Sequence, residues 1–285
     1  MEIFSLKNEI KEYILIKKRE GKKIGLVPTM GFLHEGHCQL IRKARSECEI
    51  VVLSIFVNPT QFGPSEDFNK YPRDFQRDKS LAIKEGVDII FCPEVKEMYG
   101  ENSLAYVDIK KISKIMCGKF RPGHFRGVCS VVLKLFNIIM PDAAYFGLKD
   151  YQQYLIIKKM VEDLDLNLEV FGCETVREKD GLAMSSRNKY LSESERENSL
   201  VLYHSLNLAA KNLIEKKKSI QAIKKQSMQM LEENKYVNKI DYFDIRNADD
   251  LSSVSSYKQK TFKILIASAI YIGKTRLIDN IAILI

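Results

Sequence analysis

The sequence predicts an α/β fold in which a doubly wound parallel sheet is followed by a smaller C-terminal α+β domain. Two observations lead to this prediction. Short apolar runs alternate with amphipathic stretches between residues 24 and 171, which is typical of strands and helices that take turns along a chain. After residue 176 the alternation stops, and a polar loop leads into a helical stretch and several apolar strands.

The elements of the first part follow from this alternation. Strands are predicted at 24–28, 50–57, 87–91, 143–146 and 166–172, and helices at 37–47, 73–86, 127–140 and 150–163. Because strands separated by helices pair in parallel through crossover connections, helices should cover both faces of a Rossmann-like sheet. In such a sheet a ligand binds at the carboxyl ends of the strands.

The second part is predicted to begin at residue 176, so the expected domains span 1–175 and 176–285. Ser192 and Glu195 fit a capping box that opens a long helix. The Lys-rich stretch 211–233 is also predicted to be helical. Strands are expected at 240–245, 262–271 and 275–279, with Gly273 in the turn between the last two.

Composition excludes several classes of protein. With 285 residues, of which 45% are hydrophobic and 29% charged, the chain is neither disordered nor collagen-like. The net charge of +8 divides into +2 for residues 1–175 and +6 for 176–285, but no run of five like charges occurs, so charge alone names no partner. Six scattered cysteines without a CxxC pair, and apolar runs too short to span a bilayer, indicate a cytoplasmic protein without a zinc cluster or a disulfide framework.

The most informative segment runs from Pro28 to His37, where an apolar strand turns on glycines and enters a helix. A helix N-terminus offers free N–H groups, glycines allow a ligand to approach the backbone, and two imidazoles three residues apart can contact the same phosphates. These properties suit a nucleoside triphosphate. The alternative that His34 and His37 are ordinary capping or core histidines stays open, whereas zinc is disfavoured because the pair lacks the spacing of HExxH.

A second polar cluster, with Asn58 and Gln61, follows the predicted strand 50–57. Neutral amides at a strand end suit the hydroxyl or carboxyl groups of a substrate. Asn-Pro is also an ordinary turn signal, so a purely structural role is the alternative, more so for Asn58 than for Gln61.

A third cluster follows the strand 143–146 and enters another helix. Lys149 can bind a phosphate as a mobile point charge. Asp150 can cap the helix or bind a ribose hydroxyl, and Gln153 lies within the helix. Because the carboxyl ends of parallel strands meet at one edge of a sheet, the three clusters should converge.

A fourth segment, Met184-Ser185-Ser186-Arg187, lies in the polar loop after the predicted domain boundary, close behind Gly181. Hydroxyls and a guanidinium can bind phosphates, and a loop hinged on glycine can close to exclude water. We therefore expect this loop to act as a lid.

The order of His34-x-x-His37 and Met184-Ser185-Ser186-Arg187 resembles the HIGH and KMSKS signatures of the nucleotidylyltransferase superfamily. In addition, five blocks resemble the pantothenate synthetases, the pantoate–β-alanine ligase family: PTMGFLHEGH, SIFVNPTQFGPSEDFNKYPRD, RPGHFRGV, PDAAYFGLKDYQQ and MSSRN. They span residues 28–188, and weaker matches, DYFDIRN and IGKTRLIDN, extend the resemblance over nearly the whole chain.

The resemblance implies that ATP drives the condensation of (R)-pantoate with β-alanine to pantothenate through a pantoyl adenylate, with release of diphosphate and AMP. It assigns ATP and pantoate to the first domain and the lid to the second. Magnesium would be bound mainly through the ATP phosphates, with no metal ligand assigned in the chain. A cytoplasmic homodimer is implied, with no nucleic-acid or membrane partner.

The resemblance also implies roles for individual residues. His37 would be the proton donor, in a catalytic group with His34, Lys149, Ser185, Ser186 and Arg187. The substrate-binding residues would be Gln61, Gln153 and Asn58, with pantoate on the two glutamines and β-alanine close to Gln61. The nucleotide would be held by Met30, Gly31, Phe32, Leu33, His34, Glu35, Gly36, His37, Gly147, Leu148, Lys149, Asp150, Val176, Met184, Ser185, Ser186 and Arg187.

Some assignments stay open. Tyr71, Arg121 and His124 match family blocks, and either contact with a substrate or packing of the site rim would explain them. Two other functions also fit parts of the sequence. Another HIGH-type nucleotidylyltransferase is opposed by the amides near Asn58. An RNA-binding synthetase-like protein is opposed by the mixed charges of the Lys-rich stretch and by the lack of aromatic residues among its basic ones.

Overall fold

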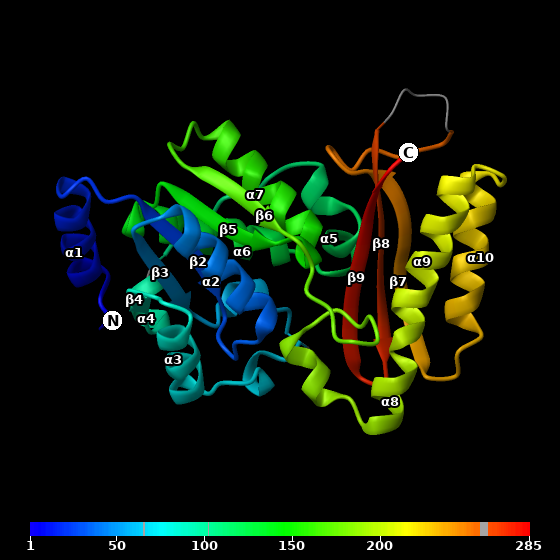
Figure 1. Cartoon of the computed structure of the whole chain (residues 1–285), viewed down its shortest axis with the longest axis horizontal. Coiled ribbons are helices and arrows are strands. Elements are labelled where there is room, and N and C mark those ends of the chain that lie inside the picture. Colours follow the sequence, from blue (N-terminus) through cyan, green and yellow to red (C-terminus); the bar gives the residue numbers. More distant parts are fainter. Residues whose placement is uncertain (65, 102, 257–261) are drawn as a thin grey trace.

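Two sheets organise the molecule (Figure 1), a computed structural model that describes residues 1–64, 66–101, 103–256 and 262–285. The first is a six-stranded parallel sheet with helices on both faces, and the second is a three-stranded antiparallel sheet near the C-terminus. The predicted fold class, a doubly wound α/β sheet followed by a smaller α+β part, is confirmed.

The order of the strands in the large sheet is β1-β4-β3-β2-β5-β6. These strands are β1 (Glu2–Phe4), β2 (Ile24–Thr29), β3 (Ile50–Ile55), β4 (Ile89–Phe91), β5 (Ala143–Gly147) and β6 (Glu169–Cys173). After β2 the chain adds β3 and β4 on one side, and later β5 and β6 on the other. The order therefore reverses between β2 and β5, and the loops after these strands flank the crevice where such sheets bind ligands.

Helices cover both faces of the large sheet, which explains why its inner strands are apolar along their whole length. Helices α2 (Glu35–Glu47) and α3 (Phe75–Lys84) cover one face, and α1 (Lys7–Arg19), α6 (His124–Ile139) and α7 (Tyr151–Asp163) cover the other. The short helices α4 (Val95–Tyr99) and α5 (Cys117–Phe120) lie between β4 and α6. The elements expected between residues 24 and 171 are present with small shifts of their ends, whereas β1 and α1 were not predicted.

The C-terminal part is an antiparallel sheet with helices on one face. Its elements are α8 (Glu193–Asn198), α9 (Leu200–Glu215), α10 (Ile220–Glu232), β7 (Val237–Asn247), β8 (Lys263–Ile272) and β9 (Thr275–Leu284). The predicted turn at Gly273 is confirmed, and its φ of 56° suits glycine. The other face packs on the first part, where Met116 and Tyr151 form one buried cluster with Leu265 and Ala267 of β8.

Two helix predictions for this part need correction. The predicted capping box is present, because Ser192 Oγ accepts a hydrogen bond from the Glu195 N–H and the Glu195 carboxylate accepts one from the Ser192 N–H. The helix that it opens is short, however, and α9 starts anew after Ser199. A continuous helix over 211–233 is wrong, because the chain leaves α9 at Lys216 with a left-handed φ of 53° before α10 begins.

Candidate active site

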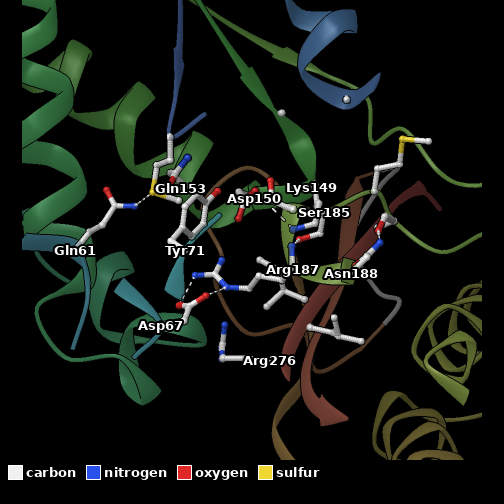
Figure 2. A pocket seen from close by; sticks show the side chains of 18 of the residues that line it. Gln61, Asp67, Tyr71, Lys149, Asp150, Gln153, Ser185, Arg187, Asn188 and Arg276 are labelled. Atoms are coloured by element: carbon white, nitrogen blue, oxygen red, sulfur yellow. Dashed lines mark hydrogen bonds and ion pairs between the residues drawn. The ribbon is translucent and has the colours of Figure 1, made fainter. Parts of the chain in front are cut away.

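A cavity of about 1260 Å³ lies between the carboxyl edge of the large sheet and the C-terminal sheet (Figure 2). All four segments that the sequence singled out contribute to its wall, although they are far apart in the chain. The expected site residues that line it are Met30, His34, Gly36, His37, Asn58, Gln61, Gly147, Lys149, Asp150, Gln153, Val176, Met184, Ser185, Ser186 and Arg187, together with Tyr71, Arg121 and His124.

Five residues expected at the nucleotide do not line this cavity: Gly31, Phe32, Leu33, Glu35 and Leu148. The Glu35 carboxylate pairs with Arg42 on the outer surface of α2, and the Leu33 side chain is fully buried in the core. The Phe32 ring lies against the cations of Arg77 and Lys189.

The first loop is held by Asp78, a buried residue of α3. Its carboxylate accepts hydrogen bonds of 2.7 Å from the N–H groups of Phe32 and Leu33. Gly31 and Phe32 have left-handed φ angles of 79° and 50°, a conformation that needs such support at a residue with a side chain. Burial raises the pKa of Asp78, although these two backbone bonds favour its charged form. Asp78 therefore fixes the backbone that leads to the two histidines.

His34 and His37 form a capping box at the start of α2. His34 Nδ1 accepts from the Gly36 N–H, and His37 Nδ1 accepts from the His34 N–H, each at 3.2 Å. The two histidines therefore cap the helix, as the structural alternative predicts, and they also line the cavity. The centres of their rings are 4.1 Å apart. Because each Nδ1 is an acceptor, the proton of each neutral imidazole lies on Nε2.

The electrostatic environment keeps both imidazoles neutral near pH 7. Burial and the positive charge of Lys149 lower the pKa of His34 to about 4. Burial, the neighbouring His34 and Lys149 lower the pKa of His37 well below its ordinary value. Both rings can therefore donate an Nε2–H hydrogen bond to a phosphate oxygen while they are uncharged.

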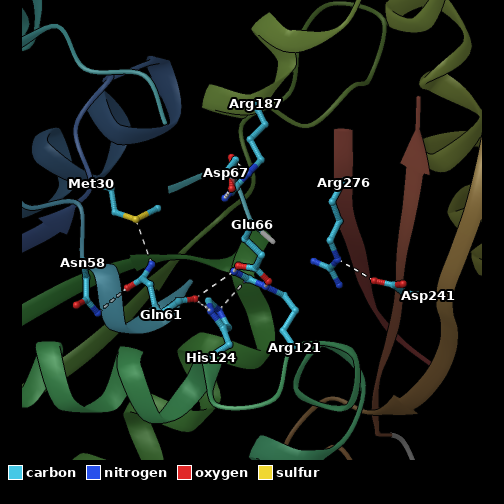
Figure 3. Close-up of polar contacts among 10 residues, drawn as sticks. All are labelled: Met30, Asn58, Gln61, Glu66, Asp67, Arg121, His124, Arg187, Asp241 and Arg276. Atoms are coloured by element: carbon cyan, nitrogen blue, oxygen red, sulfur yellow. Dashed lines mark hydrogen bonds and ion pairs between the residues drawn. The ribbon is translucent and has the colours of Figure 1, made fainter. Parts of the chain in front are cut away.

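Asn58 builds the turn that presents Gln61 (Figure 3). The Asn58 side chain is almost completely buried, and its Oδ1 accepts from the Thr60 N–H and from the Tyr99 hydroxyl. Its Nδ2 donates to Gln61 Oε1 at 3.1 Å, and Gln61 Nε2 lies 3.1 Å from Met30 Sδ. The structural alternative therefore describes Asn58 well, and Gln61 is the amide that it orients.

A second network holds the main chain of Gln61. Arg121 donates to both carboxylate oxygens of Glu66 and contacts His124 Nε2 at 3.1 Å. His124 Nδ1 lies 2.8 Å from the Gln61 carbonyl oxygen, and burial together with Arg121 lowers the pKa of His124 to about 3. A neutral His124 that accepts from Arg121 donates through Nδ1 to Gln61. Arg121 and His124 thus support the site through Gln61.

The loop after β5 is fixed from the C-terminal sheet. Asn280 Nδ2, on β9, donates to the carbonyl oxygens of Leu148 at 2.9 Å and Lys149 at 2.8 Å. Lys149 Nζ lies 3.9 Å from the Asp150 carboxylate, and both residues line the cavity. Asp150 is the N-cap of α7, but its side chain makes no capping hydrogen bond in the described part of the chain. Its carboxylate is therefore available to a ligand.

The loop that was expected to act as a lid contacts the first loop. At its base Arg177 donates to both oxygens of Asp279, and a Cβ on Gly181, whose φ is 103°, would collide with the Tyr203 ring. At its tip Ser186 Oγ donates to the Phe32 carbonyl oxygen at 3.2 Å, and Ser185 Oγ accepts from the Arg187 N–H. These contacts tie the lid to both parts of the molecule.

Sequence reasoning missed several residues that shape the site. Asp78 shares the buried side of α3 with Ala82, one helical turn away, which was the only signal for it. Glu66 and Asp67 belong to a family block but carried no assigned role. Arg276 and Asn280 belong to the weaker match IGKTRLIDN, and the fold alone brings them to the cavity and to its Lys149 loop.

Comparisons with known proteins show which family the chain resembles. The family model described as pantoate-beta-alanine ligase matches residues 2–282. A pantothenate synthetase from Caldicellulosiruptor bescii is 56% identical over 276 residues, which cover 96% of this chain and 96% of that protein.

Solved structures are similar over nearly the whole chain. The pantothenate synthetase of Thermus thermophilus has a TM-score of 0.91 and 39% identity, with 99% of both chains covered. The pantoate-beta-alanine ligase of Francisella tularensis, described as complexed with beta-gamma ATP and beta-alanine, has a TM-score of 0.76 and 36% identity, with 99% of this chain and 97% of that chain covered.

Proposed function

This chain belongs to the pantoate–β-alanine ligase family, and from that premise we propose how its residues carry out the ATP-dependent condensation of pantoate with β-alanine. The proposal rests on one observation: the same cavity is lined by the neutral imidazoles of His34 and His37, by Lys149 and Arg187, and by the Gln61 amide. Imidazoles, an ammonium and a guanidinium suit a triphosphate, and an amide suits pantoate hydroxyl or carboxyl groups.

The first chemical step forms pantoyl adenylate. A pantoate carboxylate oxygen attacks the α-phosphorus of ATP, and the bond from that phosphorus to the departing diphosphate breaks. Negative charge builds on the phosphate oxygens, and we assign its stabilisation to Nε2–H of His34 and His37, to Lys149 and to Arg187. No protein nucleophile takes part, so the main tasks of the chain are positioning and charge stabilisation.

Pantoate recognition falls to Gln61 and Gln153. Both side chains line the cavity, and Gln61 is oriented by Asn58 through its Oε1 atom. Asn58 itself is a positioning residue in this scheme, because its amide is already bonded to the turn and to the Gly127 carbonyl oxygen.

The second step transfers the pantoyl group to β-alanine. The neutral amine attacks the acyl carbon, AMP leaves and the amine loses a proton. Water is a competing nucleophile, so a closed lid protects the adenylate. The contacts of Ser186 with the first loop and of Arg177 with β9 support this role for the 176–187 loop and its assignment to a C-terminal lid domain that begins at residue 176.

Magnesium is proposed to enter with ATP. No cluster of three or more His, Cys, Asp or Glu side chains suited to a metal ion is found among the described residues. Mg²⁺ commonly binds through substrate phosphates with one or two carboxylates. Asp150 lines the cavity beside Lys149, so its carboxylate is suited to be one of these magnesium ligands.

We also propose that the protein works in the cytoplasm as a homodimer. Six thiols without a disulfide in the described structure fit a reducing compartment, and the homodimer rests on the family resemblance. No described helix is long and apolar enough to cross a membrane. The family match over nearly the whole chain favours the ligase over the other HIGH-type activity and the RNA-binding function.

The proposal is tested by a panel of acids and amines assayed for AMP release. We expect rapid AMP formation with pantoate and β-alanine together, and little with either partner replaced. Equal turnover with unrelated acids would contradict the assignment of Gln61 and Gln153 to pantoate.

A further inference from the structure

The cavity has a charged wall on the C-terminal side that the reaction scheme above does not use. Arg276 and Lys239 line this wall on β9 and β7. Both contact Asp241, and Figure 3 shows the contact made by Arg276. Arg276 Nε donates to one Asp241 oxygen at 2.8 Å, and Lys239 Nζ lies 2.9 Å from the other. The Asp241 side chain is only 1% exposed, so it is a fixed anchor.

The positive charge around Arg276 is not fully neutralised, and one of its N–H groups lacks an acceptor among the described residues. One carboxylate faces two cations, which leaves the cluster of Lys239, Asp241 and Arg276 with a net charge of +1. The Arg276 side chain is 14% exposed, and its buried Nη2 has no hydrogen-bond partner among the described residues. A buried N–H group without an acceptor is costly, and an anionic ligand would supply one.

The other arginines of the cavity are already bonded. Arg121 donates to both oxygens of Glu66, and Arg187 donates to both oxygens of Asp67. In the described structure Arg276 donates to its carboxylate partner through Nε alone, and the side chain lines the cavity. Arg276 is therefore the cavity arginine that is best prepared to accept a ligand without first breaking an ion pair.

We propose that Arg276, held by Asp241, is an oxyanion-binding residue that the C-terminal domain contributes to the active site. The oxyanion is either a phosphate of ATP or diphosphate, or the carboxylate of β-alanine. This inference deepens the proposed ligase function and rests on it. It assigns to the second domain a direct contact with substrate in addition to its lid.

The test compares Arg276→Met with Arg246→Met in the full-length enzyme. Arg246 is the matched control, because it pairs with Asp244 in the same sheet and does not line the cavity. Three quantities are measured: the affinity for diphosphate and for β-alanine by calorimetry, the exchange of labelled diphosphate into ATP, and the KM for β-alanine.

If Arg276 binds phosphate, Arg276→Met weakens diphosphate binding about 10- to 100-fold and slows the exchange. If it binds the β-alanine carboxylate, exchange is unchanged, the KM for β-alanine rises by a similar factor, and aminolysis by propylamine, which lacks the carboxylate, is unaffected. In both cases Arg276→Lys recovers part of the loss, and Asp241→Asn shows a smaller loss of the same kind.

The inference is overturned if Arg276→Met matches Arg246→Met in all three measurements. It is also overturned if β-alanine and propylamine react equally more slowly while diphosphate binding is unchanged, because that pattern indicates damaged packing. The calorimetric comparison needs no turnover and so tests Arg276 even in the absence of catalysis. A wild-type enzyme without exchange or AMP formation would instead contradict the proposed function.

Discussion

Arg187 of the lid and Asp67 of the loop after β3 form a paired contact, in which Nε and Nη2 each donate to one carboxylate oxygen at 2.9 Å. The guanidinium also lies over the Tyr71 ring, 5.6 Å from its centre. The side chain proposed to act on phosphates is thus held by a carboxylate, and the same contact joins the 184–187 loop to the loop after β3.

Asp67→Asn is expected to loosen the lid. Asparagine removes the charge that holds Arg187, so water should reach the adenylate more often. We predict that AMP formed without β-alanine will increase relative to pantothenate formed in the full reaction, while the fold is retained. Asp74→Asn is a suitable control, because Asp74 caps α3 away from Arg187. An unchanged ratio of AMP to pantothenate would show that the pair does not control water access.

Lys149→Ala is expected to lose adenylate formation without unfolding. Among the described residues the Lys149 ammonium has only a distant ion-pair partner, Asp150 at 3.9 Å, so its removal costs little stability. Removal of one charge-stabilising donor typically slows a reaction about 100- to 1000-fold. Rapid quench of the adenylate, with thermal melting as a fold check, measures both effects. Adenylation at the wild-type rate would remove Lys149 from the mechanism.

Asp78→Asn is expected to damage the first loop. Asparagine has one acceptor oxygen for the two N–H groups of Phe32 and Leu33, so one buried donor loses its partner. That loss costs about 1–3 kcal/mol in the free energy of unfolding. The KM for ATP should rise as well, because the loop leads directly to His34. If chemical denaturation and ATP kinetics are both unchanged, Asp78 does not hold this loop.

The two amides near β3 are expected to behave differently. Gln61→Ala should raise the KM for pantoate with little change in stability. Asn58→Ala should raise this KM and also lower the melting temperature, because the buried Asn58 amide holds the turn through four partners, Thr60, Tyr99, Gln61 and Gly127. Pantoate kinetics and melting curves decide the matter, and a stable Asn58→Ala enzyme that is defective only for pantoate would make Asn58 a direct ligand.

The buried histidines predict an acid-sensitive fold. The pKa of His34 is about 4 in the folded protein and ordinary, about 6.5, in the unfolded chain, so the unfolded chain binds more protons between these values. Stability should therefore fall as the pH is lowered through 6.5 toward 4. Each such histidine contributes at most about 1.4 kcal/mol per pH unit.

His34→Asn tests this dependence, since asparagine can still cap α2 but does not titrate. Chemical denaturation at pH 7 and pH 5 should show a smaller loss of stability for His34→Asn than for the wild type. His204→Asn, at an exposed position on α9, is the control. An equal loss of stability in His34→Asn and the wild type would show that His34 is not the group that titrates.

The alternating strands and helices of the large sheet were predicted well from the sequence, because the spacing of apolar residues depends directly on which side chains are buried. The strands β2 to β6 and the meeting of their loops at one edge follow from that pattern and from the topology of parallel sheets. The N-terminal pair β1 and α1 was missed because charged residues interrupt its apolar positions. The break at Lys216 was missed because a lysine in a left-handed conformation has no signal in the sequence.

The site was predicted less completely than the fold. Motif residues such as His37 and Gln61 were identified, but the residues that hold them were not. Asp78, Glu66 and Asn280 act through contacts between segments that are 45 or more residues apart in the chain, and no local pattern encodes such contacts. A folded structure is needed to find them.

We propose above all that one cavity binds ATP beside pantoate, and that the two form pantoyl adenylate there before β-alanine reacts. Exchange of labelled diphosphate into ATP, measured without β-alanine, tests it most directly. We expect exchange that requires both pantoate and magnesium. Absence of exchange in a folded enzyme, or exchange that proceeds equally well without pantoate, would contradict it.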